Sequence, residues 1–116
     1  MKALETAAER LAATARLLEE AGNVGVWVRS DDAGDNREKR RLLREAGWEA
    51  ASALRALPET PRLPATRARM TALAEQVEPL WEIVTDTMDV NYDLDSRVMA
   101  AQSEAEELAK RLRRNE

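Results

Sequence analysis

Acid–base chemistry in this chain must come from lysine, tyrosine and carboxylate side chains, because the sequence has no histidine and no cysteine. Their absence removes the commonest general base and the thiol nucleophile, and it excludes Ser–His and Cys–His catalytic units, disulfides and thiolate metal sites. Lys39, Tyr92 and the carboxylates are left to move protons, and they form no recognisable catalytic motif. The sequence therefore predicts a protein that is not an enzyme and has no cofactor.

The spacing of polar residues suggests a binding site instead. When each apolar stretch is projected at about 100° per residue, polar side chains occupy the inward positions toward one end. These positions are Arg29, Asn36, Lys39, Arg40, Asn91, Tyr92 and Arg97. Below them the inward residues are apolar, and few are large. An apolar floor with a few convergent polar groups is typical of ligand sites, although the ends of bundles are also wet and their long cations extend outward.

Arginines in such a ring would offer planar, permanently charged donors to carboxylate, carbonyl or phosphate oxygens. We therefore expect a small-molecule ligand with an apolar aromatic body and at least one acceptor group. The expected ligand-binding residues are Gly22, Gly25, Arg29, Arg40, Leu43, Trp81, Val84, Met88, Asn91, Arg97, Val98 and Ala101.

Acidic and amide side chains alternate at Asp89, Asn91, Asp93 and Asp95, as in the first ligand positions of a calcium loop. The pattern then fails, because Leu94 stands at the glycine position and Ala100 at the position of the bidentate glutamate. We expect no metal site here. Helix capping and pairing with Arg97 are the expected roles of these aspartates.

Four helices are predicted to position these side chains. Leu4, Leu11 and Leu18 recur every seven residues, and three similar stripes follow. We expect an all-α, antiparallel four-helix bundle in one domain, with helices over 3–29, 36–57, 65–90 and 94–114. Asp35 is placed to cap the second helix, and Asp93 or Asp95 the fourth. The heptad phase also runs through Asn91, so the alternative is three helices with one long C-terminal helix.

The segment "EEAGNVGVWVRSDDAGDN" leaves the end of the first helix open. A stop at Gly22 would form a Schellman end but leave a connection of about fourteen residues, which is unusually long. Continuation costs ~3–5 kcal/mol of helix propensity but keeps the seven-residue phase, so we expect the helix to continue. Gly22 and Gly25 would then face inward, either for close backbone packing or to leave a cavity.

Pro79 is predicted to interrupt the third helix. It lies inside the third apolar stripe and should kink the helix about one turn earlier or start a new one.

Two tryptophans are predicted to lie on the surface. Trp27 and Trp48 project away from their stripes, and Trp48 is expected among Arg41, Arg44 and Arg55. An exposed tryptophan flanked by arginine is typical of an interface, so the alternative function is a protein-interaction or self-association module.

Overall composition limits the partners. The net charge is −4 with acidic and basic residues mixed, which argues against nucleic acid. No apolar run approaches the roughly 18 residues of a membrane span, and the N-terminus does not resemble a signal peptide. We expect a soluble, cytoplasmic protein without membrane partners.

With regular heptads, a capped second helix, hairpins of similar length and neither cysteine nor histidine, the chain resembles computationally designed helical bundles as a class. Its preference for arginine over lysine is also typical of proteins from high-GC genomes.

Overall fold

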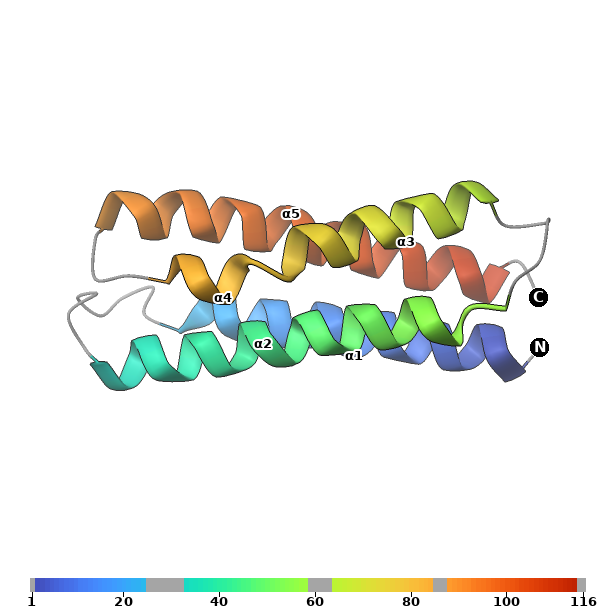
Figure 1. Cartoon of the computed structure of the whole chain (residues 1–116), viewed down its shortest axis with the longest axis horizontal. Helices are drawn as coiled ribbons and strands as arrows, with labels where there is room; N and C mark the ends of the chain where they lie inside the picture. Colours follow the sequence, from blue (N-terminus) through green and yellow to red (C-terminus); the bar gives the residue numbers. More distant parts are fainter. Residues whose placement is uncertain (1, 25–32, 59–63, 85–87, 115–116) are drawn as a thin grey trace.

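The computed structural model describes residues 2–24, 33–58, 64–84 and 88–114, and in these residues it shows an all-α bundle. The helices are α1 (Lys2–Asn23), α2 (Ala33–Ala56), α3 (Pro64–Val77), α4 (Leu80–Ile83) and α5 (Met88–Arg114). Because α3 and the short α4 together form one arm, the molecule is a four-helix bundle, elongated to 47 × 19 × 18 Å (Figure 1). The predicted fold class is confirmed.

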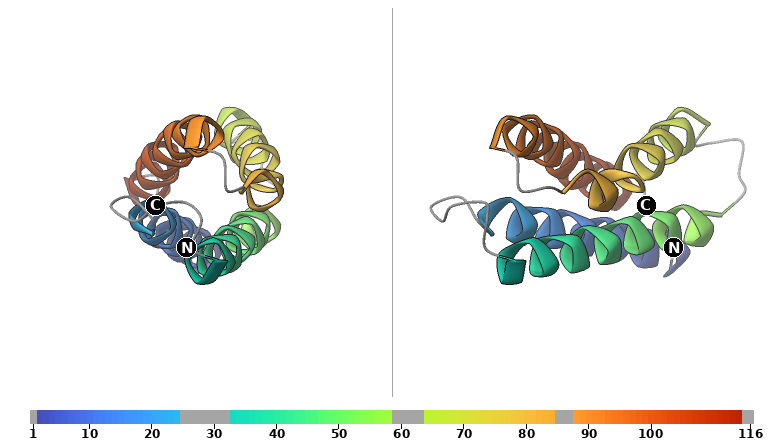
Figure 2. Two further views of the ribbon diagram at one scale, coloured as in Figure 1. Left: turned by 90° about the vertical axis from the view of Figure 1, so that its left-hand side faces the viewer. Right: turned by 60° about the vertical axis from the view of Figure 1, so that its left-hand side comes forward.

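The four arms surround a common axis in the order α1, α2, α3 with α4, and α5 (Figure 2). Helix α1 packs along both α2 and α5, whereas α3 and α4 pack on α2 and α5. The diagonal partners of the bundle are therefore α1 with the third arm, and α2 with α5. This order decides which side chains meet across each seam.

The apolar stripe of α1 is buried as its spacing predicts. Leu4, Leu11 and Leu18 are 0–4% exposed, and the smaller residues between them are buried as well. Burial of each leucine contributes about 1.5–3 kcal/mol relative to leaving it in water. A core rich in alanine lets the helices approach closely, which compensates for the scarcity of large apolar side chains.

Helix α1 ends at Asn23, and the amide of Val24 closes the last turn with a 3.2 Å hydrogen bond to the carbonyl of Glu20. The sequence predicted that this helix ends near residue 29, whereas the structure ends it at Asn23. Gly22 and Asn23 are both weak helix formers that favour a helix end. The remainder of the prediction, on the conformation of 25–29, falls outside the described residues.

Two predicted helix starts are wrong. Helix α2 begins at Ala33 and not at 36, so Asp35 lies inside its first turn and is not the cap. Helix α5 begins at Met88 and not at 94, so Asp93 and Asp95 also lie within the helix. Aspartate is a poor residue in the middle of a helix, but near the N-terminus its charge is favourable because it opposes the positive end of the helix dipole.

Pro79 separates the two helices of the third arm. Helix α3 ends at Val77, and α4 starts at Leu80 with Pro79 before it (φ −82°, ψ −6°). A proline ring has no amide hydrogen to donate. Of the two outcomes predicted for Pro79, a kink or a new helix, the structure shows the new helix. Val84 then leaves the helical conformation (φ −58°, ψ 119°). The predicted helix over 65–90 and the alternative long C-terminal helix are therefore both wrong.

Gly22 in α1 and Gly47 in α2 both lie at ordinary packing distances from the neighbouring helix or its end. A Cβ atom added at Gly22 would lie 3.7 Å from Cγ1 of Val98, and one added at Gly47 would lie 3.7 Å from Cα of Glu78. These are normal van der Waals separations. At Gly22 the neighbouring helix therefore leaves room for about one methyl group, neither a closest backbone approach nor a wide hollow.

Replacing Gly47 by alanine should raise the free energy of unfolding by about 0.8–1 kcal/mol, the difference in helix propensity between the two residues. The new methyl group fits without displacing Glu78, the residue that follows α3. Urea unfolding followed by circular dichroism measures the change. A destabilised Gly47→Ala variant would show that the seam between α2 and the third arm is tighter than these distances indicate.

Candidate functional site at the polar end of the bundle

Lys39 is the one lysine buried among the residues that the structure describes, and it is 5% exposed. Its Nζ donates to Oδ1 of Asp95 at 2.7 Å and to the backbone carbonyl of Val24 at 3.2 Å. The side chain thus runs from α2 past the end of α1 to α5. Helix α1 has no basic residue in its own last turn, so Lys39 supplies the positive charge that favours a helix C-terminus.

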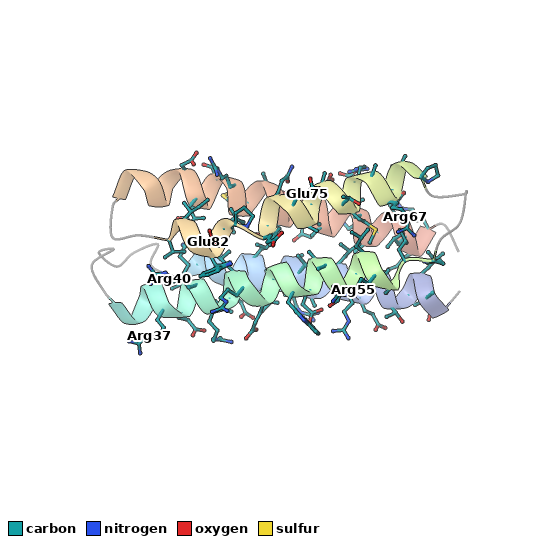
Figure 3. All side chains as sticks on the ribbon, in the orientation of Figure 1. Arg37, Arg40, Arg55, Arg67, Glu75 and Glu82 are labelled. Atoms are coloured by element: carbon teal, nitrogen blue, oxygen red, sulfur yellow. The ribbon has the colours of Figure 1, made fainter. Side chains whose placement is uncertain are left out.

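Arg40 does the same for a different helix. Its Nη2 donates to the carbonyl of Val84 at 2.9 Å, immediately after α4, which also lacks a basic residue in its last turn. At the opposite end of the bundle, Nη2 of Arg67 donates to the carbonyls of Leu57 and Pro58 at 3.1 and 2.9 Å, just past α2. Arg40 and Arg67 lie at opposite ends of the bundle (Figure 3). We call Lys39, Arg40 and Arg67 the capping cations, because each satisfies carbonyls after the end of another helix.

Arg97 does not join this group. It pairs with Asp93 on the same helix at 3.0 Å, and the two side chains are 57% and 61% exposed. The expected pairing of an aspartate in this segment with Arg97 is confirmed. The expectation that Arg97 points into the bundle is wrong, because the first turns of α5 place it on the outer surface.

The apolar residues of the predicted floor are packed into the core. Leu43, Val84, Val98 and Ala101 are 0–2% exposed and belong to one buried cluster. Gly22 lies against Val98 in the same region.

Trp81 is only partly buried and lies at the seam between α4 and α2. The guanidinium of Arg44 stands over its ring at 4.7 Å from the ring centre. Such a cation–π contact holds the indole face against an arginine of the neighbouring helix. Trp81 therefore packs at the edge of the core, whereas the sequence predicted that it would lie in the centre of the apolar floor.

Part of the predicted ligand site falls outside what the structure describes. Gly25 and Arg29 belong to the undescribed segment 25–32, as does Trp27. Met88, Asn91 and Tyr92 lie in α5 and Asn36 lies in α2, but their side chains are outside the described part. The structure brings together Gly22, Leu43, Val84, Val98 and Ala101 in the core, with Lys39 and Arg40 at its end. The ligand pocket itself stays a prediction.

Trp48 lies on the outer side of α2 and is 58% exposed. Arg10 of α1 reaches over its ring, with Cζ at 5.5 Å from the ring centre, while Nη1 of Arg10 also pairs with Glu49 at 3.1 Å. The prediction that Trp48 projects outward is confirmed. The neighbours predicted for Trp48 were all arginines of the same helix, so Arg10 was not among them. Its position on the side of α1 that faces α2 is the feature that could have identified it.

Arg41, one of the expected neighbours of Trp48, is held by carboxylates along α2. It pairs with Glu38 one turn before it and with Glu45 one turn after it, the latter at 2.7 Å. The hydrogen bonds from Arg41 lower the pKa of Glu38 below its ordinary value, and the same bonds raise the pKa of Arg41. This exposed network fixes the direction of one arginine beside Trp48.

The described residues contain no group of three or more acidic side chains placed to hold a metal ion. None of the helices in the described ranges is long and apolar enough to cross a membrane. No known protein family, curated protein or solved structure matches this chain.

Proposed function

We propose that this protein is an interaction module whose binding anchor is Trp48 on the outer face of α2. The observation that carries the proposal is the exposure of the Trp48 ring, over which Arg10 of the neighbouring helix α1 stands. Tryptophan and arginine are the residues most enriched at binding hot spots, because they combine a large apolar area with directional donors. We name this surface the Trp48 face and define it by Trp48, Arg10, Arg41 and Arg55.

The geometry favours an interface over the small-molecule site. In the described residues, Lys39 and Arg40 donate to carbonyls and a carboxylate of this chain, and Arg97 pairs with Asp93. Groups already engaged in this way must break those bonds before they can bind a ligand. The exposed part of Trp48 makes no bond that has to be broken before a partner binds. Arg10 covers the ring from one side, and Trp48 is 58% exposed.

Selection of peptide binders tests this proposal. A phage-displayed peptide library selected on the folded wild-type chain should enrich sequences that bind Trp48→Ala at least about tenfold more weakly, the loss expected for an anchor. The free energy of unfolding should change by no more than about 0.5 kcal/mol, because the residue lies on the surface.

Arg55→Ala is the matched control, since it removes a peripheral arginine of the same face that contacts only Ser52 among the described contacts. It should weaken the selected peptides less than Trp48→Ala does. Peptides that bind wild type and Trp48→Ala equally well would contradict the proposal. A large loss of stability in Trp48→Ala would instead assign the ring to the core.

A further inference from the structure

We infer that the partner of the Trp48 face is a second copy of this chain, bound through a different surface around Met99. This inference rests on the proposed function of the Trp48 face and names its partner. Met99 on α5 is 65% exposed and is, with Trp48, one of the two large apolar side chains exposed in the described residues. Each molecule therefore presents two exposed apolar side chains of different shape, a flat ring and an unbranched chain.

The charges around Met99 are opposite to those around Trp48. Gly22 of α1 lies against Val98 of α5, so the last turns of α1 are level with Met99. Glu19 and Glu20 are exposed there, and Glu106 is exposed two turns further along α5. We name this surface the Met99 face and define it by Met99, Glu19, Glu20 and Glu106. Its glutamates outnumber Arg16, the basic residue one turn before Glu19.

The Trp48 face is basic by comparison. Exposed arginines along α2, together with the half-buried Arg10 of α1, outnumber the glutamates between them, although the whole chain is acidic. Arg37 and Arg55 both point away from the bundle on the outer side of α2 (Figure 3). Opposite charges on two exposed faces steer the faces together and disfavour pairing of either face with itself.

The side chains at the two centres also suit each other. Methionine is unbranched and polarizable, and its sulfur makes favourable contacts with aromatic rings. A flexible Met99 can therefore cover the part of the indole that Arg10 leaves open. The glutamates around Met99 would then face the arginines around Trp48.

The arrangement of the helices requires the two faces to meet between different copies. Helices α2 and α5 are diagonal in the bundle, with α1 between them on one side (Figure 2). The exposed side chains Trp48 on α2 and Met99 on α5 are therefore directed to different sides of the bundle. A contact between unlike surfaces is heterologous, and each bound copy still presents one free face. The structure therefore predicts a chain or ring of copies and not a closed symmetric dimer.

Sedimentation velocity with two single-face variants tests this inference. Trp48→Ala removes the anchor of one face, and Met99→Lys places a positive charge in the centre of the other. Wild type should increase in mass with concentration at low salt and return to a monomer near 1 M salt, where the Debye length is only about 3 Å. Each variant alone should remain a monomer, and thermal unfolding should show that both are folded.

The mixture of the two variants gives the decisive result. Trp48→Ala retains its Met99 face and Met99→Lys retains its Trp48 face, so the mixture should form a complex that stops at two chains. Wild type that stays monomeric at every concentration would overturn the inference, while peptides that depend on Trp48 would still support the proposed function. Self-association that persists in Trp48→Ala would also overturn the inference, because the contact between copies would then not involve the Trp48 face. A mixture that stays monomeric while wild type associates would also overturn the inference, because the intact Met99 face of one variant and the intact Trp48 face of the other would then not bind each other.

Discussion

Asp95→Ala should lower the free energy of unfolding by about 3 kcal/mol, the lower end of the cost of breaking a buried ion pair. The Lys39 side chain is 6% exposed, and its Nζ lies 2.7 Å from Oδ1 of Asp95. Without that carboxylate, a buried ammonium keeps only the carbonyl of Val24 as a described partner. We choose the lower end because Asp95 itself is 34% exposed and water reaches its side of the pair. Urea unfolding measures the change.

The partner variant should behave differently. Lys39→Met keeps the apolar stem and removes the buried charge, and the remaining Asp95 can be hydrated, so the expected loss is about 1 kcal/mol. The double variant should be no less stable than Asp95→Ala, because the two residues form one pair. Additive losses in the double variant would show that Lys39 and Asp95 act independently.

Leu43→Ala is expected to lower the free energy of unfolding by about 3 kcal/mol, within the range for a buried leucine in a well-packed core. Leu43 is fully buried and belongs to the main core cluster of the described residues. Val84 and Val98 of the same cluster are closed off from water in the same way, so we expect that the cavity created by the substitution is not hydrated from the surface. Urea unfolding gives the magnitude.

Leu54→Ala on the same helix is the matched control. Leu54 is half-buried at the edge of the core, so its removal should cost about half as much or less. A loss below about 1 kcal/mol for Leu43→Ala would contradict a filled core at this position. It would favour the ligand pocket that the sequence predicted there.

The sequence predicted the arms of the bundle well because apolar spacing alone determines which face of each helix is buried. Leu4, Leu11 and Leu18 required no knowledge of their partners. Helix ends were harder to predict. Asp35 and Asp93 are of the residue type that caps helices. A helix can nevertheless start before such a residue when acidic side chains in its first turns interact favourably with its dipole. Pro79 was decisive because its missing amide hydrogen does not depend on tertiary context.

The candidate site was harder to predict, for a physical reason. Projection of a single helix predicts inward positions for Lys39 and Arg40, of which only Lys39 is buried. It cannot show that the end of another helix lies within their reach. Their partners, the carbonyls of Val24 and Val84, are backbone groups that carry no signal in the sequence. A ring of cations around a ligand and cations that cap neighbouring helices have the same residue pattern, and only the positions of the helix ends distinguish them.

The capping cations also determine how the helix ends open. An isolated helix frays at its termini, because its last carbonyls gain little from remaining in the helix. Here the residues that follow α1, α2 and α4 are bonded to Lys39, Arg67 and Arg40, and each of these cations belongs to a helix other than the one whose end it caps. Fraying at one end must therefore break a bond to another arm of the bundle. Backbone amides in these last turns should exchange with solvent at rates closer to those of the core than to those of free helix ends, because local opening is coupled to the packing of the whole bundle.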